Sequence, residues 1–227
     1  MHSRFGRTLV VCLLALALVP ATARAGSPLI CFPMAIGDAP SLAWGSGDGW
    51  NTPSPDLDRA RLAVDTLSLL GPRTAVLVRM ETLRRAVIYA SRSDVAARGL
   101  FEALRSRAAV ASGGKVDPLA QFDLGYAVAA WREAGHVAQR ELAAVSPSED
   151  GYALVRQALA ARGADPEMEY AAALMTHGRM LRGASNAHLR AALAGATEGS
   201  GLARTLAAHR SLWGNRIQGL PVAAATR

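Results

Sequence analysis

The densest group of ionisable side chains in an otherwise apolar stretch centres on Glu81. Glu81 lies four residues after Leu77 and seven before Ile88, so it borders or enters the apolar face of a predicted helix. A carboxylate there needs a cationic partner, because an unpaired buried charge is costly. Arg84 and Arg85 follow at i+3 and i+4, the favourable order for pairing on a helix. The pattern predicts a salt-bridged helix edge or, as the alternative, an Arg/Glu-lined groove for an anionic ligand.

Two further ionisable side chains lie on faces of predicted helices that are otherwise small and apolar. Asp123 shares its face with alanines at i+4, i+7 and i+11, which indicates a close helix contact or a small polar cleft. His177 follows Tyr170 by seven residues on an Ala-rich helix, where a packed polar role near the helix end is the simplest interpretation. If Glu81, Asp123 and His177 converged in one pocket, they could act as the acid–base groups of an enzyme.

The familiar catalytic and cofactor motifs are absent. The sequence has no H-E-x-x-H, no C-x-x-C, no haem attachment motif, no G-x-S-x-G elbow and no Walker loop. His136, His177, His188 and His209 include no pair at the i, i+3 or i+4 spacing of a chelating helix. We therefore expect no metal and no cofactor, and a non-enzymatic binding or interaction protein is favoured over an enzyme.

The N-terminus has the three parts of a cleavable secretory signal peptide. Arg4 and Arg7 form its basic start, an apolar run of 11 residues begins at Leu9, and the small residues Ala23 and Ala25 precede the expected cleavage site. The apolar run is about half of the roughly 20 residues that span a bilayer, which disfavours a membrane anchor. We expect an exported chain, periplasmic or secreted, with no transmembrane segment after cleavage.

Cleavage leaves a single cysteine, Cys31, so the mature chain has no internal disulfide. Its apolar neighbours Ile30 and Phe32 favour a buried thiol. An intermolecular bridge that forms a homodimer is the alternative.

The mature chain is mildly basic. It has 22 Lys and Arg against 18 Asp and Glu, because the leader contains three arginines and no acid. We take this excess as spread along the chain, which differs from the dense basic stripe of a nucleic-acid-binding protein. The expected partner is a protein or a small anionic ligand, and not a nucleic acid.

Composition divides the chain into a leader (1–25), a Gly/Pro-rich arm (26–54), a helical domain (55–213) and a tail that we expect to be disordered (214–227). The arm is dense in turn-forming residues and carries Trp44 and Trp50. These tryptophans predict contacts of the arm with the helices behind it or with a partner.

Helix start and stop signals recur after residue 54. Four prolines each follow a Ser or Asp, an N-cap residue before proline at the first helical position, and glycines mark the ends. The expected helices are 55–70, 74–91, 94–112, 118–144, 147–162, 166–182, 186–194 and 201–213. No strand alternation is clear. The sequence therefore predicts an all-α fold of antiparallel helix hairpins, packed as an irregular bundle or a short solenoid-like stack.

Overall fold

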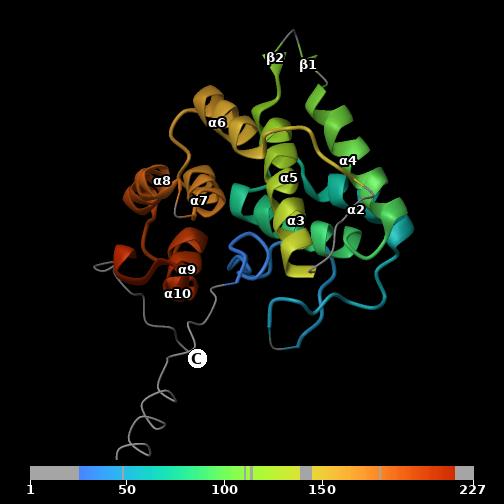
Figure 1. The fold of residues 1–227 in the computed structure, drawn as a ribbon, viewed down its shortest axis with the longest axis horizontal. Helices are drawn as coiled ribbons and strands as arrows, with labels where there is room; N and C mark the ends of the chain where they lie inside the picture. Colours follow the sequence, from blue (N-terminus) through green and yellow to red (C-terminus); the bar gives the residue numbers. More distant parts are fainter. Residues whose placement is uncertain are drawn as a thin grey trace, which may run out of the picture.

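The computed structural model describes residues 26–47, 49–109, 111–112, 115–138, 145–178 and 180–217, and it is built from helices packed against each other (Figure 1). The elements are η2 (Arg59–Arg61), α2 (Leu62–Leu69), α3 (Val76–Ala90), α4 (Asp94–Ala109), β1 (Ala111–Ser112), β2 (Lys115–Val116), α5 (Pro118–Ala138), α6 (Gly151–Arg162), α7 (Pro166–Met175), α8 (Arg182–Gly195), α9 (Gly201–Ala208), α10 (Arg210–Trp213) and η3 (Gly214–Ile217). The all-α prediction is confirmed. The expected signal peptide lies outside the described residues.

The strand content is one short antiparallel ladder within the described residues, in which Ala111 faces Val116 and Ser112 faces Lys115. It joins α4 to α5, and its Val116 is exposed. The described part of the expected tail forms η3, where Ile217 is buried. The helical structure thus continues four residues beyond the expected end at residue 213.

The expected caps form at the start of two helices. Asp117 accepts a hydrogen bond from the Leu119 amide at the start of α5, and Asp165 accepts one from the Met168 amide at the start of α7. Such side chains satisfy amides that have no partner within the helix. The start of α6 differs from the prediction of residue 147, because the helix begins at Gly151 and its cap is Asp150. The end of α7 differs from the prediction of residue 182, because the helix ends at Met175 and α8 begins at Arg182.

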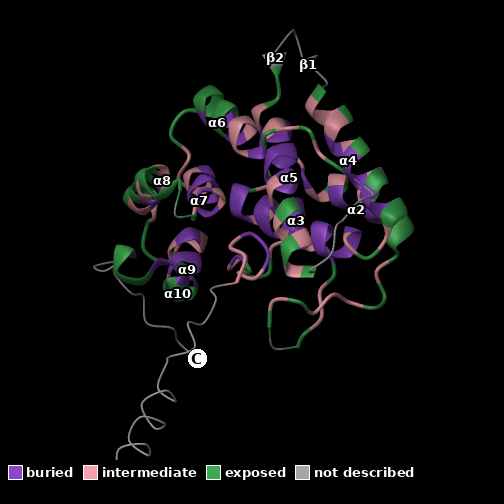
Figure 2. Cartoon of the chain, in the orientation of Figure 1, coloured by how far each residue is buried: buried purple, intermediate pink, exposed green. Residues whose placement is uncertain are grey.

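Helix α3 is the centre of the fold. Of its 15 residues, 13 are buried, and it packs against α2, α4, α5 and α7. Figure 1 shows α3 and α5 in the middle of the view, with α2 and α4 on one side and α7 to α10 on the other. Figure 2 shows the same centre in purple, as buried residues. Because the buried set includes Arg79, Glu81 and Arg84, the fold must supply partners for these charges.

The arm lies against the core and adds to it. Leu29, Ile30, Met34 and Leu42 are buried in the same apolar cluster as the helices. Farther along, an isolated bridge pairs Trp44 with Pro53 and closes a loop. The arm thus covers part of α3. Of the two alternatives for the arm, contact with the helices is the one that this packing supports.

Helices α5 and α6 cross at a pair of glycines. A Cβ built on Gly125 would lie 2.7 Å from the Gly151 carbonyl oxygen, and one built on Gly151 would lie 2.5 Å from the Gly125 carbonyl oxygen. Backbone atoms on both sides leave no room for a side chain. The crossing distance is therefore set by these two residues.

Within the described residues, no helix combines the length and the apolar character that a membrane span requires.

Replacing Gly125 with Ala should lower the free energy of unfolding by about 2 kcal/mol, because the added methyl group must push α5 and α6 apart. Gly99→Ala in α4 is the matched control, since no atom lies within 4 Å of its built Cβ. That control should gain about 1 kcal/mol from helix propensity. Urea unfolding followed by circular dichroism measures both changes in the free energy of unfolding. If the two substitutions changed stability in the same direction, the close contact of α5 and α6 at Gly125 would be contradicted.

Candidate functional site

Glu81 sits at the middle of α3 with 1 % of its surface exposed. Its Oε2 accepts hydrogen bonds from the Met34 amide at 3.0 Å and from Arg84 Nε at 2.9 Å. Its Oε1 accepts from Arg84 Nη2 and Arg85 Nε, both at 2.8 Å. Glu81 and the two arginines are therefore brought together as the spacing predicted. The carboxylate also binds the backbone of the arm.

The two arginines extend this connection to other parts of the arm. Arg84 Nη1 donates to the carbonyls of Ile30 and Trp50, at 3.0 and 2.9 Å. Arg85 Nη1 donates to the Leu42 carbonyl at 2.7 Å. Three separate stretches of the arm thus attach to one turn of α3. Charge-assisted hydrogen bonds of this kind are about twice as strong as neutral ones.

Trp44 packs on the same cluster. The guanidinium carbons of Arg84 and Arg85 lie 5.1 and 5.5 Å from its ring centroid. Tyr89, one turn beyond, meets the Trp44 ring edge-on and donates to the Ala43 carbonyl at 2.6 Å. Aromatic and cation–π contacts therefore reinforce the hydrogen bonds. Trp50 contributes its carbonyl oxygen to Arg84.

The electrostatics of Glu81 follow from this geometry. Burial acts to raise the pKa of Glu81, but the hydrogen bonds and positive charges of Arg84 and Arg85 outweigh it and hold the pKa below its usual value. This stabilisation is present above the pKa of the unfolded chain and is lost as the pH falls through the folded-state pKa. The hydrogen-bonding groups of the Arg/Glu cluster are thus bound to the arm of the same chain.

Asp123, in α5, belongs to a second buried ionic cluster. Its Oδ2 lies 2.6 Å from Arg79 Nη1 and 3.3 Å from Arg107 Nη1. Arg79 also donates to the carbonyls of Gly71 and Thr74, and Arg107 donates to the Leu70 carbonyl at 2.6 Å. This cluster fixes the turn between α2 and α3.

The second cluster is incompletely satisfied. Oδ1 of Asp123 and Nη1 of Arg107 are buried and have no hydrogen-bond partner among the described atoms. Burial raises the pKa of Asp123 to about 6, against the charge of Arg79. The ionised form of Asp123 is therefore less well stabilised than that of Glu81.

His177 lies just beyond the end of α7, near α10. Its Nε2 is 3.0 Å from the Leu212 carbonyl oxygen and 3.1 Å from Arg216 Nη2, and its ring meets Trp213 edge-on. Burial, followed by the positive charges of Arg216 and Arg182, lowers the pKa of His177. The interpretation of a packed polar residue near a helix end fits these contacts.

The three groups of the hypothetical enzyme have separate partners. No hydrogen bond or ion pair between described residues joins any two of Glu81, Asp123 and His177. Each one fixes a different segment: the arm, the α2–α3 turn or the end of α10. The described residues also include no group of three His, Cys, Asp or Glu arranged to hold a metal.

Cys31 is half-buried and is a free thiol. Burial raises the pKa of this thiol, so it is mostly protonated at neutral pH. A Cβ built on Gly26 would lie 2.9 Å from the Cys31 sulfur, so the start of the arm folds back over this residue.

Two ionisable contacts carried no signal in the sequence. Glu133, in α5, accepts a hydrogen bond from the Leu29 amide at 2.8 Å. Burial raises the pKa of Glu133 to about 7. His188 bridges two helices, with Nδ1 2.5 Å from Glu169 Oε2 and Nε2 2.8 Å from Tyr152 Oη. Their partners lie 19 to 104 residues away, beyond any local pattern.

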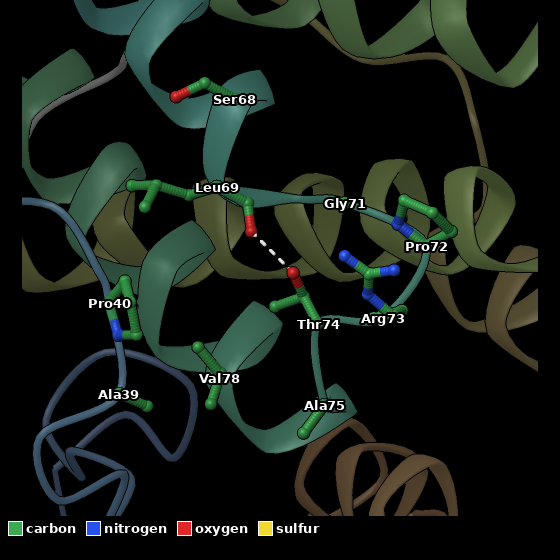
Figure 3. Close-up of a pocket in the computed structure, with 10 residues that line it drawn as sticks. All are labelled: Ala39, Pro40, Ser68, Leu69, Gly71, Pro72, Arg73, Thr74, Ala75 and Val78. Atoms are coloured by element: carbon green, nitrogen blue, oxygen red, sulfur yellow. Dashed lines mark hydrogen bonds between the residues drawn. The ribbon is translucent and has the colours of Figure 1, made fainter.

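An open pocket of about 620 Å³ lies where the arm meets the α2–α3 turn. Figure 3 shows Pro40, Leu69 and Val78 on one side of this pocket and Pro72 and Arg73 on the other. The lining residues are Ala39, Pro40, Ser68, Leu69, Gly71, Pro72, Arg73, Thr74, Ala75 and Val78. This volume lies in the usual range of ligand pockets.

The two ionic clusters support opposite walls of this pocket. The Glu81 cluster attaches to Met34 and Leu42, which flank the arm residues of the lining. The Asp123 cluster, through Arg79, binds carbonyls of Gly71 and Thr74 in the other wall. Buried ion pairs thus anchor the two segments that line the pocket.

No family model matches the chain, and neither the curated proteins nor the solved structures include a match.

Replacing Glu81 with Gln should lower the free energy of unfolding by about 3 kcal/mol, because Arg84 would remain buried without its counter-charge. Glu102→Gln, on the exposed side of α4, is the control and should change stability by less than about 0.5 kcal/mol. Urea unfolding at pH 7 measures both. Equal small effects would contradict the role of Glu81 as an anchor.

Glu133→Gln should become more stabilising as the pH rises. The pKa of Glu133 is raised to about 7, so the folded chain binds more protons than the unfolded chain between about pH 4.5 and 7. Stability of the unsubstituted protein therefore declines across this window through Glu133, whereas the variant lacks this decline. The difference in unfolding free energy should move by about 2 kcal/mol in favour of the variant between about pH 4.5 and 7.5. A difference that is independent of pH would contradict the burial of an ionisable Glu133.

Proposed function

We propose that the chain is an exported, non-enzymatic binding protein of the cell envelope, and that its ligand occupies the pocket between the arm and the α2–α3 turn. The observation that carries this proposal is the pocket itself, which is open, about 620 Å³ in volume and lined by two separately anchored segments. Both wall segments are anchored by ionic clusters of buried α3, which favours a pre-formed site.

The lining defines the ligand class. Pro40, Leu69, Pro72 and Val78 offer apolar surface. Thr74 uses its hydroxyl within the turn, where it donates to the Leu69 carbonyl at 2.8 Å (Figure 3). Arg73 is exposed and has no hydrogen bond or ion pair to another described residue. A small amphiphile with an apolar body and an anionic head group matches this combination.

Export is proposed from the N-terminal sequence, with its basic start, 11-residue apolar run and small residues before Gly26. A periplasmic or secreted location follows from that proposal. We also propose that the pairs α5–α6 and α7–α8, whose members pack closely, are antiparallel hairpins of the kind expected from the sequence. A homodimer through Cys31 remains an alternative arrangement of the same protein.

Decanoate should bind the protein with a sub-millimolar dissociation constant, measured by isothermal titration calorimetry. Arg73→Gln should weaken this binding about tenfold, because it removes a charged hydrogen-bond donor. Ala75→Phe should abolish it, since Ala75 is an exposed residue of the lining and the larger ring fills the pocket.

Arg98→Gln, at an exposed arginine on α4, is the matched control and should leave decanoate binding unchanged. Decyltrimethylammonium has a similar apolar chain and the opposite charge, so it should bind much more weakly. Equal affinity for both amphiphiles would contradict the role of Arg73. Binding that survives Ala75→Phe would contradict the pocket as the site.

A further inference from the structure

Positive charge is concentrated at the C-terminal end of the sequence. Residues 176–227 contain seven arginines and one acid, Glu198. Residues 26–175 contain 15 Lys and Arg against 17 Asp and Glu. The expectation that the basic excess is spread along the chain is therefore wrong. The net charge of the whole chain does not reveal this concentration, because residues 26–175 are nearly neutral and make up most of the chain.

Two of these arginines lie near each other without a carboxylate partner. Arg216 bonds Asn186, which lies one turn after Arg182 on α8, and burial followed by the charge of Arg182 lowers the pKa of Arg216. Arg216 contacts Asn186 Oδ1 at 3.3 Å, His177 Nε2 at 3.1 Å and the Trp213 ring at 5.3 Å. No ion pair between described residues involves either arginine. Like charges held together on a surface favour an anion that neutralises both.

Two exposed apolar residues come directly before Arg182 in the chain. These residues are Met180 and Leu181, and their side chains are 98 % and 47 % exposed. They are two of the five large apolar residues that stand out on the described surface. Figure 2 shows exposed residues along the adjoining α8, which buries only Ser185, Leu189 and Ala192. The surface thus combines an apolar tip with uncompensated positive charge.

We propose that the surface formed by Met180, Leu181, Arg182 and Arg216 docks on an anionic lipid membrane. Arg182 and Arg216 would lie against negatively charged head groups, while Met180 and Leu181 enter the boundary with the acyl chains. The exposed Met180 and Leu181 favour a membrane over a nucleic acid, because a phosphate backbone offers these side chains no apolar surface. The proposal is independent of the pocket and of its ligand.

Vesicle co-sedimentation tests the proposal. It uses the protein purified from its own cells, and mass spectrometry identifies the N-terminal residue of that protein. The probes are vesicles of phosphatidylcholine alone and of phosphatidylcholine mixed with phosphatidylglycerol. Binding should be strong only on the mixed vesicles and should fall when salt is raised from about 50 to about 500 mM. The double variant Arg182→Gln/Arg216→Gln should bind more than about tenfold more weakly, at about fivefold per arginine.

Met180→Ser should weaken binding severalfold at every salt concentration, because insertion of an apolar side chain is not screened. Arg59→Gln, at an exposed arginine of η2, is the charge-matched control and should change binding less than about twofold. Circular dichroism melting confirms that all the variants are folded. Equal binding to both vesicle types, unchanged binding by the double variant, or binding to duplex DNA without binding to vesicles would each overturn the proposal.

Discussion

A single buried carboxylate organises the centre of this protein. Glu81 lies inside a helix that is buried on nearly every side, where an unpaired charge could not persist. Arg84 and Arg85 neutralise this charge, and each also donates hydrogen bonds to backbone carbonyls of the arm. A segment rich in Gly, Pro and Ser, which has little regular structure of its own, thereby receives fixed positions along α3. The arm is held by polar contacts to its backbone as well as by its apolar side chains.

A second buried ion pair holds an irregular segment on another side of α3. Arg79 joins Asp123 to carbonyls of the α2–α3 turn, so a second irregular segment is held by a buried ion pair. The candidate pocket lies where these two segments meet, which links its shape to charges that do not line it. The two clusters differ in quality, because Glu81 has donors on both oxygens whereas Asp123 Oδ1 has none among the described atoms. The C-terminal helices, in contrast, leave their arginines facing outward, and there the chain has charge available for a partner.

The sequence predicted what local spacing controls. The all-α class, the caps at Asp117 and Asp165, and the pairing of Glu81 with Arg84 and Arg85 all follow from residues within four positions of one another. It could not predict that backbone carbonyls of the arm would fill the remaining donors of the arginines, because every residue offers the same acceptor. It also missed Glu133 and His188, whose partners become neighbours only in the folded chain. The α7 end was misplaced because the stop at Thr176, whose hydroxyl binds the Ala172 carbonyl, resembles an ordinary helical residue in the sequence.

Hydrogen exchange of the unsubstituted protein, followed by mass spectrometry over the arm peptides, tests whether α3 holds the arm. The amides of Leu29, Met34 and Ser54 donate to Glu133, Glu81 and Tyr89, respectively. They should therefore exchange slowly, with protection approaching that of α3 itself, because each is bound by a side chain of α3 or α5. Arm amides that exchange as fast as those of an unstructured peptide, while α3 stays protected, would contradict the anchoring by Glu81 and the pocket that depends on it.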